Sequence, residues 1–329
     1  MPLSQRELAS AELTGELYQR LRSNIQGRLL QDEPLSAHTS FRVGGPAKFY
    51  AFPATTDEIG TLLNLCQELQ LDYFIIGYGT NLLVSDEGFA GCVIDLAEAC
   101  RILTIGSDDF SRHRRLKSSL PPIICAGAGV EGGDVVRQAA AAGLAGLEKL
   151  AGIPGGIGGW VQMNAGAFRT TVSDHLIDLE IMEKDGSLRR ISRAEAGFAY
   201  RASPGLNDKI ILSAQFELEK APAMDVLREV EATIAERHKR GIMTMPSAGS
   251  VFKNPTGHFA ARLLEAVGAK GMREGGVEVS SSHANFIVNI RGGTAADIIR
   301  LIDRLRELVR FQFNVELELE LKTLGFDGA

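Results

Sequence analysis

The sequence of 329 residues lacks several features that would assign it to a special class of protein. It has no apolar run of the roughly 18 or more residues that a membrane-spanning helix requires, and its first ten residues hold no apolar core of a leader segment. Positive charge is not in excess, because 35 Lys and Arg face 41 Asp and Glu, so nothing indicates a nucleic-acid or anionic-membrane partner. We therefore expect a cytoplasmic protein.

Cysteine is also scarce, and no two of the four cysteines are spaced as C-x-x-C. They are Cys66, Cys92, Cys100 and Cys125. Three of them lie in or beside apolar stretches, so we expect reduced, buried side chains. No group of His, Cys and carboxylate residues has the spacing of a metal site, and we expect no metal.

What is present is an ordinary globular composition, with 45% hydrophobic and 23% charged residues, in a chain long enough for two or three domains. Helical and strand patterns alternate, which predicts an α+β fold. We expect a helix over 5–30, a hairpin of 177–183 with 188–191 around Asp185-Gly186, and a final strand over 315–321. We also expect 101–105 to pair with 123–126 across a polar, partly basic excursion at 106–119. Ala221-Pro222 marks a domain boundary.

Two glycine-rich loops follow apolar stretches, at 77–83 and 127–132, and a third glycine-rich stretch lies at 153–159. The second matches G-x-G-x-x-G, so a dinucleotide-binding Rossmann domain has to be considered. That fold needs a second parallel strand ending in an acid about 20 residues on, and no such strand is present. Glycine loops let main-chain N–H groups approach a phosphate, but they also occur where the chain is simply tightly packed. The residues alone leave both interpretations open.

The segment 246–255 places the hydroxyl of Ser250 between a glycine and an apolar pair, on a turn fixed by proline at both ends and loosened by Gly249. A hydrolase elbow, G-x-S-x-G, is excluded because Val251 and Phe252 follow the serine. From spacing alone Ser250 is either an exposed turn residue or a positioned reactive group. Near the C-terminus, 315–322 alternates strictly, so its three glutamates share one face. That pattern favours a solvated strand edge.

Taken together, these segments resemble the UDP-N-acetylenolpyruvoylglucosamine reductase family, flavoenzymes of bacterial cell-wall synthesis. The matching pieces occur in the family's order and span residues 38–325. They are 38–47, 77–86, 146–168, 200–201, 246–255, 282–286 and 320–325. The short distance between Arg201 and Ser250 is similar to the family's shorter subtype.

The resemblance implies a two-part FAD-binding region of the vanillyl-alcohol-oxidase type at 1–98 and 99–221. A C-terminal α+β substrate-binding domain would occupy 222–329. The implied reaction converts UDP-N-acetylglucosamine enolpyruvate to UDP-N-acetylmuramate, with NADPH as reductant and non-covalent FAD as carrier. It serves peptidoglycan synthesis, and through it cell shape and division, and the family implies a monomer. The alternatives are another FAD oxidoreductase of this flavin fold and a flavin-free binder of UDP-sugars.

Three residues match the family's catalytic positions. Ser250 would protonate the substrate, and Arg201 would stabilise the charge that develops on it. Glu320 would polarise the substrate carboxylate or assist the proton donor. The family's catalytic glutamate lies five residues before a closing glycine, so Gly325 selects Glu320 over the glutamates before it.

The resemblance also implies contacts to cofactor and substrate. The cofactor-binding residues would be Arg42, Gly77, Gly79, Thr80, Asn81, Leu82, Gly152, Ile153, Pro154, Gly158, Gly159, Asn164 and Gly166. The substrate-binding residues would be Tyr200, Lys253, Asn254, His283 and Asn285. Tyr78, Trp160 and Arg169 depart from the family pattern. Tyr78 is expected to point outward or to stack, and Trp160 to lie close enough to FAD for its emission to be quenched.

Overall fold

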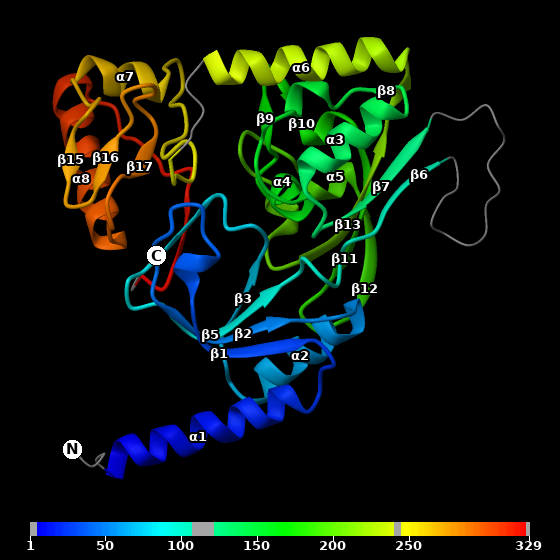
Figure 1. Cartoon of the computed structure of the whole chain (residues 1–329), viewed down its shortest axis with the longest axis vertical. Coiled ribbons are helices and arrows are strands. Elements are labelled where there is room, and N and C mark those ends of the chain that lie inside the picture. The colour runs from blue at the N-terminus through cyan, green and yellow to red at the C-terminus, as the bar shows by residue number, and fades with distance from the viewer. Residues whose placement is uncertain (1–4, 107–121, 240–244, 327–329) are drawn as a thin grey trace.

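The computed structural model describes residues 5–106, 122–239 and 245–326. Helices and strands are mixed along the whole chain, which confirms the α+β class (Figure 1). The basic part of the excursion at 106–119 lies outside the described residues. Within the described ranges, no helix is both long and apolar enough to cross a bilayer.

The first sheet has the strand order β1(Arg28–Pro34), β2(Pro46–Phe52), β5(Phe89–Asp95), β3(Tyr73–Ile76). β1 is antiparallel to β2, whereas β5 is parallel to both β2 and β3. α2(Thr56–Glu68) follows β2, and its N-cap Thr55 accepts a hydrogen bond from the main-chain N–H of Glu58. The loop of interest, 77–81, leaves the carboxyl end of β3.

The helix expected over 5–30 is wrong in its second half, because α1(Gln5–Arg22) ends at Arg22 and β1 begins at Arg28. Apolar residues continue at a helical step to Leu29, but this side chain is buried in the first sheet. A Cβ atom on Gly27 would lie 2.0 Å from the carbonyl oxygen of Phe52. Close strand pairing therefore overrides the local helical pattern here.

The second sheet is antiparallel throughout, with the order β12(Leu188–Ser192), β11(Leu176–Met182), β13(Ile210–Glu217), β7(Ile123–Gly127), β6(Leu103–Gly106). The predicted hairpin and the predicted pairing of β6 with β7 are both confirmed. Helices α3(Gly132–Ala141), α4(Ile157–Gln162) and α6(Ala223–Lys239) lie on the same side of this sheet (Figure 1). Short elements complete this part: β8(Leu144–Ala145) with β14(Glu219–Lys220), β9(Gly166–Ala167) with β10(Thr170–Thr171), and α5(Arg193–Ala196).

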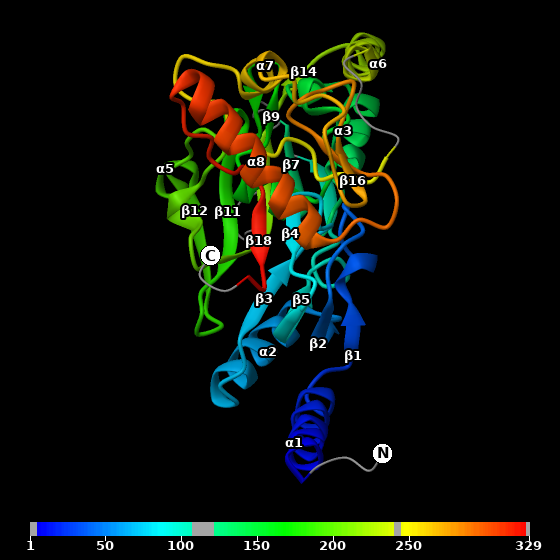
Figure 2. The same ribbon diagram turned by 90° about the vertical axis from the view of Figure 1, so that its left-hand side faces the viewer.

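The C-terminal layer contains α7(Ala260–Ala266), the sheet of β15(Arg273–Glu274), β16(Val277–Val279) and β17(Ile287–Asn289), and the long helix α8(Ala295–Phe313). The chain then returns to the first half of the molecule, where β18(Lys322–Leu324) pairs in parallel with β4(Leu82–Val84) (Figure 2). The strand expected over 315–321 is wrong, because this stretch is irregular apart from one bridge at Leu319, and strand pairing starts only at Lys322.

Two large cores hold these parts together, and all four cysteines are buried as expected. The larger core joins the first and second sheets. The other lies in the C-terminal layer but includes Phe41, Val43 and Leu83 from the first half of the chain. The division at 98/99 and 221/222 stays a prediction, and we associate its three parts with the two sheets and the C-terminal layer.

Candidate active site

The turn that carries Ser250 lies between two other segments of the C-terminal layer. Ser250 forms an antiparallel bridge with Phe286, and Phe252 forms another with Leu319. On the Glu320 side, the main-chain N–H of Glu320 donates to the carbonyl of Val251 at 2.8 Å. Gly249 has φ +81°, and nothing lies within 4 Å of the position where its Cβ would be. The serine is thus half-buried on a turn clamped from both sides.

Asn285 holds this turn from behind. Its Oδ1 accepts a hydrogen bond from the N–H of Phe252 at 3.0 Å, and its Nδ2 donates to the carbonyl of Phe252 at 2.8 Å. The side chain is only 4% exposed. Both ends of the amide are therefore used by the main chain just after Ser250.

Arg201 and Glu320 form an ion pair between the second sheet and the C-terminal segment. Arg201 Nε donates to Glu320 Oε1 at 2.8 Å, and Arg201 Nη2 donates to the carbonyl of Gly166 at 3.0 Å. Burial raises the pKa of the Glu320 carboxyl, while the charges of Arg201 and Lys253 oppose this rise. The pair is thus partly withdrawn from water, with side-chain exposures of 22% and 15%.

Glu320 is set apart from the two glutamates that precede it. Glu316 and Glu318 have side-chain exposures of 72% and 76%, and they pair with Arg310 and Lys253. Because 315–321 is not a regular strand, strict alternation does not give the three carboxylates the same surroundings. The solvated-edge interpretation is right for two of them and wrong for Glu320.

Three predicted substrate contacts lie around this centre. The main-chain N–H of Asn254 donates to the Tyr200 hydroxyl at 3.3 Å, which joins the C-terminal layer to the segment that carries Arg201. Asn254 Oδ1 also accepts a hydrogen bond from the N–H of Ala260. Lys253 Nζ lies 3.4 Å from Glu318 Oε2. Polar groups of the second sheet's part and of the C-terminal layer therefore meet at the segment that follows Ser250.

His283 lies behind the Ser250 turn rather than beside the ion pair. Its ring stacks on Phe286, the bridge partner of Ser250, with the two centroids 4.2 Å apart. Burial lowers its pKa, and its Nδ1 has no hydrogen-bond partner within the described residues. Because this nitrogen is buried, it faces no open space in the structure, and the role of His283 in substrate binding stays a prediction.

The loop at 77–81 reaches the same centre from the first sheet. Asn81 Nδ2 donates to the carbonyl of Glu320 at 3.0 Å, and the N–H of Lys322 donates to the carbonyl of Asn81 at 3.0 Å. Gly79 has φ +58°, and its Cβ would lie 2.0 Å from the carbonyl oxygen of His38, so only glycine suits this position. The predicted phosphate loop is therefore hydrogen-bonded directly to the segment that carries the predicted catalytic glutamate.

The second glycine loop, at 127–132, is used for packing. Its N–H groups at Ala128 and Gly129 donate to the carbonyls of Leu212 and Cys100. A Cβ on Gly132 would lie 2.1 Å from the ring of Trp160. The literal G-x-G-x-x-G match thus reflects close contact between chain segments, in agreement with the rejection of a Rossmann domain.

The third loop, at 153–159, rests on the second. The N–H groups of Ile157 and Gly158 donate to the carbonyls of Val130 and Ala128. Pro154 accepts a hydrogen bond from Trp160 Nε1 at 3.1 Å, and the Trp160 side chain is 3% exposed. Trp160 therefore lies under the loop, on its core side.

Tyr78 connects the first loop to the other two. Its hydroxyl donates to the carbonyl of Gly129 at 3.1 Å, and its ring carbons would lie 3.0 Å from a Cβ on Gly156. Thr80 Oγ1 would lie 2.8 Å from a Cβ on Gly155. Tyr78 is nevertheless 41% exposed, so it packs against the neighbouring loop while keeping part of its ring at the surface.

The remaining predicted cofactor residues have different surroundings. Arg42 is exposed and has φ +56°, whereas Leu82 is buried in β4. Asn164 is buried and donates to the carbonyl of Ala199, two residues before Arg201. Gly152 has φ +77° and lies against the side chain of Arg237. Leu82 and Asn164 thus use their side chains for the protein itself.

The residues of the first loop fit the pyrophosphate of a bound FAD. The main-chain N–H groups of 77–81 donate to no acceptor in the described part of the chain. A side chain on Gly77 or Gly159 would meet no atom within 4 Å. Unused N–H groups beside open space on glycine backbone are what a phosphate needs.

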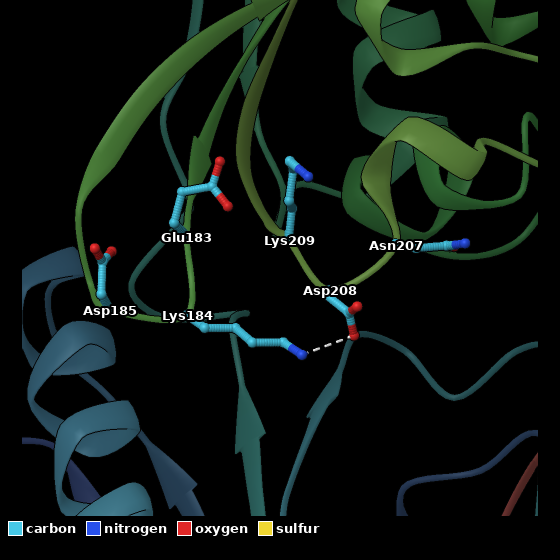
Figure 3. A pocket seen from close by; sticks show the side chains of 6 residues that line it. All are labelled: Glu183, Lys184, Asp185, Asn207, Asp208 and Lys209. Atoms are coloured by element: carbon cyan, nitrogen blue, oxygen red, sulfur yellow. Dashed lines mark ion pairs between the residues drawn. The ribbon is translucent and has the colours of Figure 1, made fainter.

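Two hollows on the described part of the chain lie away from these residues. One of about 530 Å³ is formed at the β11–β12 turn by charged and amide side chains, including Lys184 and Asp208, whose Nζ and Oδ1 are 3.0 Å apart (Figure 3). It contains no predicted site residue. This open polar hollow is not the site described above.

The sequence analysis missed two residues that join the C-terminal layer to the first half of the chain. Asp86 accepts hydrogen bonds from the first turn of α8, and Asn289 Nδ2 donates to the carbonyl of Phe41 at 3.0 Å. Asp86 closes the glycine-containing segment at 77–86, so its position in that motif was the available indication. Nothing in the sequence pattern linked it to a helix that starts more than two hundred residues later.

Comparisons with known proteins agree with this arrangement. A family model described as the C-terminal domain of UDP-N-acetylenolpyruvoylglucosamine reductase matches residues 241–324, and one described as an FAD binding domain matches 47–192. They confirm the expected FAD-binding region followed by a separate C-terminal domain.

Individual relatives match over nearly the whole chain. The chain is 38% identical over 313 residues to the UDP-N-acetylenolpyruvoylglucosamine reductase of Moorella thermoacetica, covering 95% of this chain and 97% of that protein. It is 39% identical over 302 residues to the one of Pelobacter propionicus, covering 92% and 97%. The crystal structure of the Thermus caldophilus enzyme is similar with a TM-score of 0.70 and 33% identity, over 91% of this chain and 99% of that chain.

Proposed function

The chain belongs to the UDP-N-acetylenolpyruvoylglucosamine reductase family, and from this membership we propose how its own residues carry out the reaction. It is an FAD-dependent oxidoreductase that reduces UDP-N-acetylglucosamine enolpyruvate in the synthesis of peptidoglycan precursors. One observation carries the assignment of roles. The Arg201–Glu320 ion pair is bonded through the Glu320 main chain to the Ser250 turn.

FAD, when bound, supplies the hydride that reduces the enolpyruvyl double bond. In our proposal the unused N–H groups of 77–81 hold its pyrophosphate, with the Thr80 hydroxyl as a further donor. The flat parts of FAD lie against main chain that carries few side-chain atoms. This main chain comes from the third loop and its neighbours, which are Gly152, Ile153, Pro154, Gly158, Gly159 and Gly166. Arg42 contributes a cation at the surface, and Asn164 and Leu82 act through the segments that they anchor.

Ser250 donates the proton that completes the reduction. Hydride addition at one carbon of the double bond leaves enolate charge on the neighbouring carbon and carboxylate, and that carbon takes the proton. A serine hydroxyl is a weak acid, but an enolate is a strong enough base to accept its proton. The clamped turn of Ser250 holds the hydroxyl in one place for this transfer.

Arg201 and Glu320 control the charge on the substrate carboxylate. The guanidinium group of Arg201 is a permanent cation with a planar set of donors, which suits an enolate or carboxylate. Because burial raises the pKa of Glu320, more of it is protonated near neutral pH than of an ordinary glutamate. In the protonated form it donates a hydrogen bond to the substrate carboxylate instead of repelling it.

The UDP-sugar is held by polar groups of the C-terminal layer together with Tyr200. Lys253 and Asn254 follow Ser250 by three and four residues in the chain, and Tyr200 directly precedes Arg201. His283, whose ring stacks on Phe286, is the remaining proposed substrate contact. Asn285 acts through the main chain of Phe252, and so holds the serine turn in the conformation that binds substrate.

We further propose that NADPH is the reductant and that the enzyme is a monomer in the cytoplasm. A UDP-linked substrate carries phosphate charges that do not cross a bilayer unaided, which places its reduction on the side where it is made. Supply of the precursor links the enzyme to cell shape and division. Sedimentation at the mass of one chain, 35.4 kDa, with and without substrate is the expected result for a monomer.

The proton-donor role is tested by Ser250→Ala, assayed by oxidation of NADPH in the presence of UDP-N-acetylglucosamine enolpyruvate. We expect substrate-dependent turnover to fall at least ~100-fold, since loss of a general acid costs about 10² or more. Bound FAD, measured by its visible absorbance, and NADPH oxidation without substrate should stay near the wild-type level.

Ser247→Ala is the matched control, because the Ser247 hydroxyl lies in the same turn and accepts a hydrogen bond from the N–H of Gly249. It should keep most of the turnover. Equal turnover in Ser250→Ala and the wild type would overturn the proposed role.

A further inference from the structure

The first turn of α8 is capped by two different parts of the molecule. Its N-cap Thr294 accepts a hydrogen bond from the N–H of Asp297 at 3.1 Å, within the C-terminal layer. The N–H groups of Ala295 and Ala296 donate instead to Asp86 Oδ1 and Oδ2, at 2.8 Å and 2.9 Å. One carboxylate from the flavin half, the part of the chain proposed to bind FAD, thus accepts hydrogen bonds from two N–H groups that have no partner within the helix.

Asp86 stands at a point where the flavin half and the C-terminal segment already meet. It follows β4, which pairs with β18, and the N–H of Ser85 donates to the carbonyl of Leu324. β18 begins two residues after Glu320. Asp86 therefore ties the start of α8 to the same edge that receives the Glu320 segment.

α8 also supports the Ser250 turn. Its buried face, which includes Ile298 and Leu301, shares one apolar core with Val251 and Phe252, the two residues after Ser250. Arg306 of α8 lies over the Phe252 ring, 6.0 Å from its centroid. A shift of α8 would consequently be passed on to the serine turn.

We propose that Asp86 is a positioning residue that fixes the substrate-binding layer against the flavin region. By holding α8 it sets where Ser250 lies relative to the Arg201–Glu320 pair. A negative carboxylate suits this position, because it accepts hydrogen bonds from two N–H groups at once and interacts favourably with the positive end of the helix dipole. The inference rests on the proposed roles of Ser250 and Glu320, and it adds a residue that touches neither substrate nor cofactor.

The test compares Asp86→Ala with Thr294→Ala in the FAD-loaded enzyme. Both variants remove a cap from the first turn of α8, so both lower its stability, but only Asp86→Ala cuts the link to the flavin half. We expect kcat/KM for the enolpyruvyl substrate to fall roughly three- to tenfold in Asp86→Ala, as loss of a cap contact allows. The kcat/KM of Thr294→Ala should stay within about twofold of the wild-type value, and the amount of bound FAD should be unchanged in both variants.

Hydrogen exchange gives an independent readout. In Asp86→Ala, faster exchange should extend from the amides of Ala295 and Ala296 to β18, whereas in Thr294→Ala it should stay near Asp297. Asp86→Asn, which keeps one acceptor oxygen but no charge, should give intermediate kinetics.

Equal kinetics in Asp86→Ala and Thr294→Ala, or wild-type kinetics in Asp86→Ala, would overturn the proposal. Loss of FAD from Asp86→Asn would also overturn it, because Asp86 would then serve the flavin region itself. If instead Ser250→Ala keeps its turnover, the proposed chemistry fails, while the exchange result still reports on the link made by Asp86.

Discussion

At the scale of single residues, the state of one carboxyl group controls the proposed chemistry. Glu320 is buried beside a cation, and these two surroundings act on its pKa in opposite directions. Burial raises the pKa because it disfavours the charged form, and Arg201 lowers it by charge and by a hydrogen bond. If Arg201 is removed, the effect of burial on the pKa of Glu320 is opposed less strongly, so this pKa should rise further.

Arg201→Met should therefore change the pH profile as well as the rate. Because the protonated form of Glu320 is the one proposed to meet the substrate carboxylate, kcat/KM falls as pH rises through its pKa. In Arg201→Met this falling limb should move to higher pH by about one unit, the lower end of the effect of a neighbouring cation. The maximal rate should drop because the cation that stabilises the enolate is missing.

Arg201→Lys serves as the control, since it keeps the positive charge but not the planar fork. Its alkaline limb should stay near that of the wild type. A limb that stays in place in Arg201→Met, measured as kcat/KM against pH, would mean that Glu320 does not set the profile.

At the scale of elements, the loop at 127–132 shows how a motif can be matched for a reason other than its usual ligand. Its glycines allow the loop, α3 and the third glycine loop to approach one another closely. Gly132 faces the Trp160 ring, whereas the adjacent Gly133 has only ordinary contacts with flexible side chains at 3.5 Å or more. Position 132 therefore has no room for a side chain, whereas position 133, the next residue of α3, has room for one.

Gly132→Ala should destabilise the protein by about 1–3 kcal/mol, because the new methyl group overlaps a buried ring. Gly133→Ala should leave stability unchanged or raise it by up to about 1 kcal/mol, because alanine favours a helix. Chemical denaturation of the FAD-loaded protein measures both. Equal stability of the two variants would contradict the packing role of the loop.

At the scale of the whole molecule, the candidate site is assembled from three distant stretches. The loop at 77–81 comes from the first sheet, Arg201 from the segment before β13, and Ser250 and Glu320 from the C-terminal part. FAD held by the first and third loops would bridge the two sheets. A ligand that binds only the folded protein stabilises it in proportion to the logarithm of its concentration.

Removal of FAD should therefore lower the melting temperature of the protein. Adding FAD back at about 100 times its Kd should raise the free energy of unfolding by roughly 3 kcal/mol. Trp160, the single tryptophan, lies directly under the third loop, so its emission should rise when flavin is removed and fall when FAD returns. Riboflavin, which has no pyrophosphate for the N–H groups of 77–81, is the matched control and should restore little. Unchanged Trp160 emission would contradict the placement of FAD at this loop.

By itself, the sequence determined the elements whose signals are local. The β11–β12 hairpin follows from Asp185-Gly186 between two apolar stretches, and the pairing of β6 with β7 follows from two apolar stretches on either side of a polar one. The order of motifs along the chain likewise pointed to the family. Such features depend on neighbours within a few residues, which a linear pattern records.

Only the tertiary structure decided what distant segments do to one another. It ended α1 at Arg22 because Leu29 is needed in the first sheet, and it buried Glu320 while leaving Glu316 and Glu318 in solvent. It also brought Asp86 to the start of α8. Burial and close contact between segments far apart in the chain arise from packing, and they have no period or spacing by which a single sequence could reveal them.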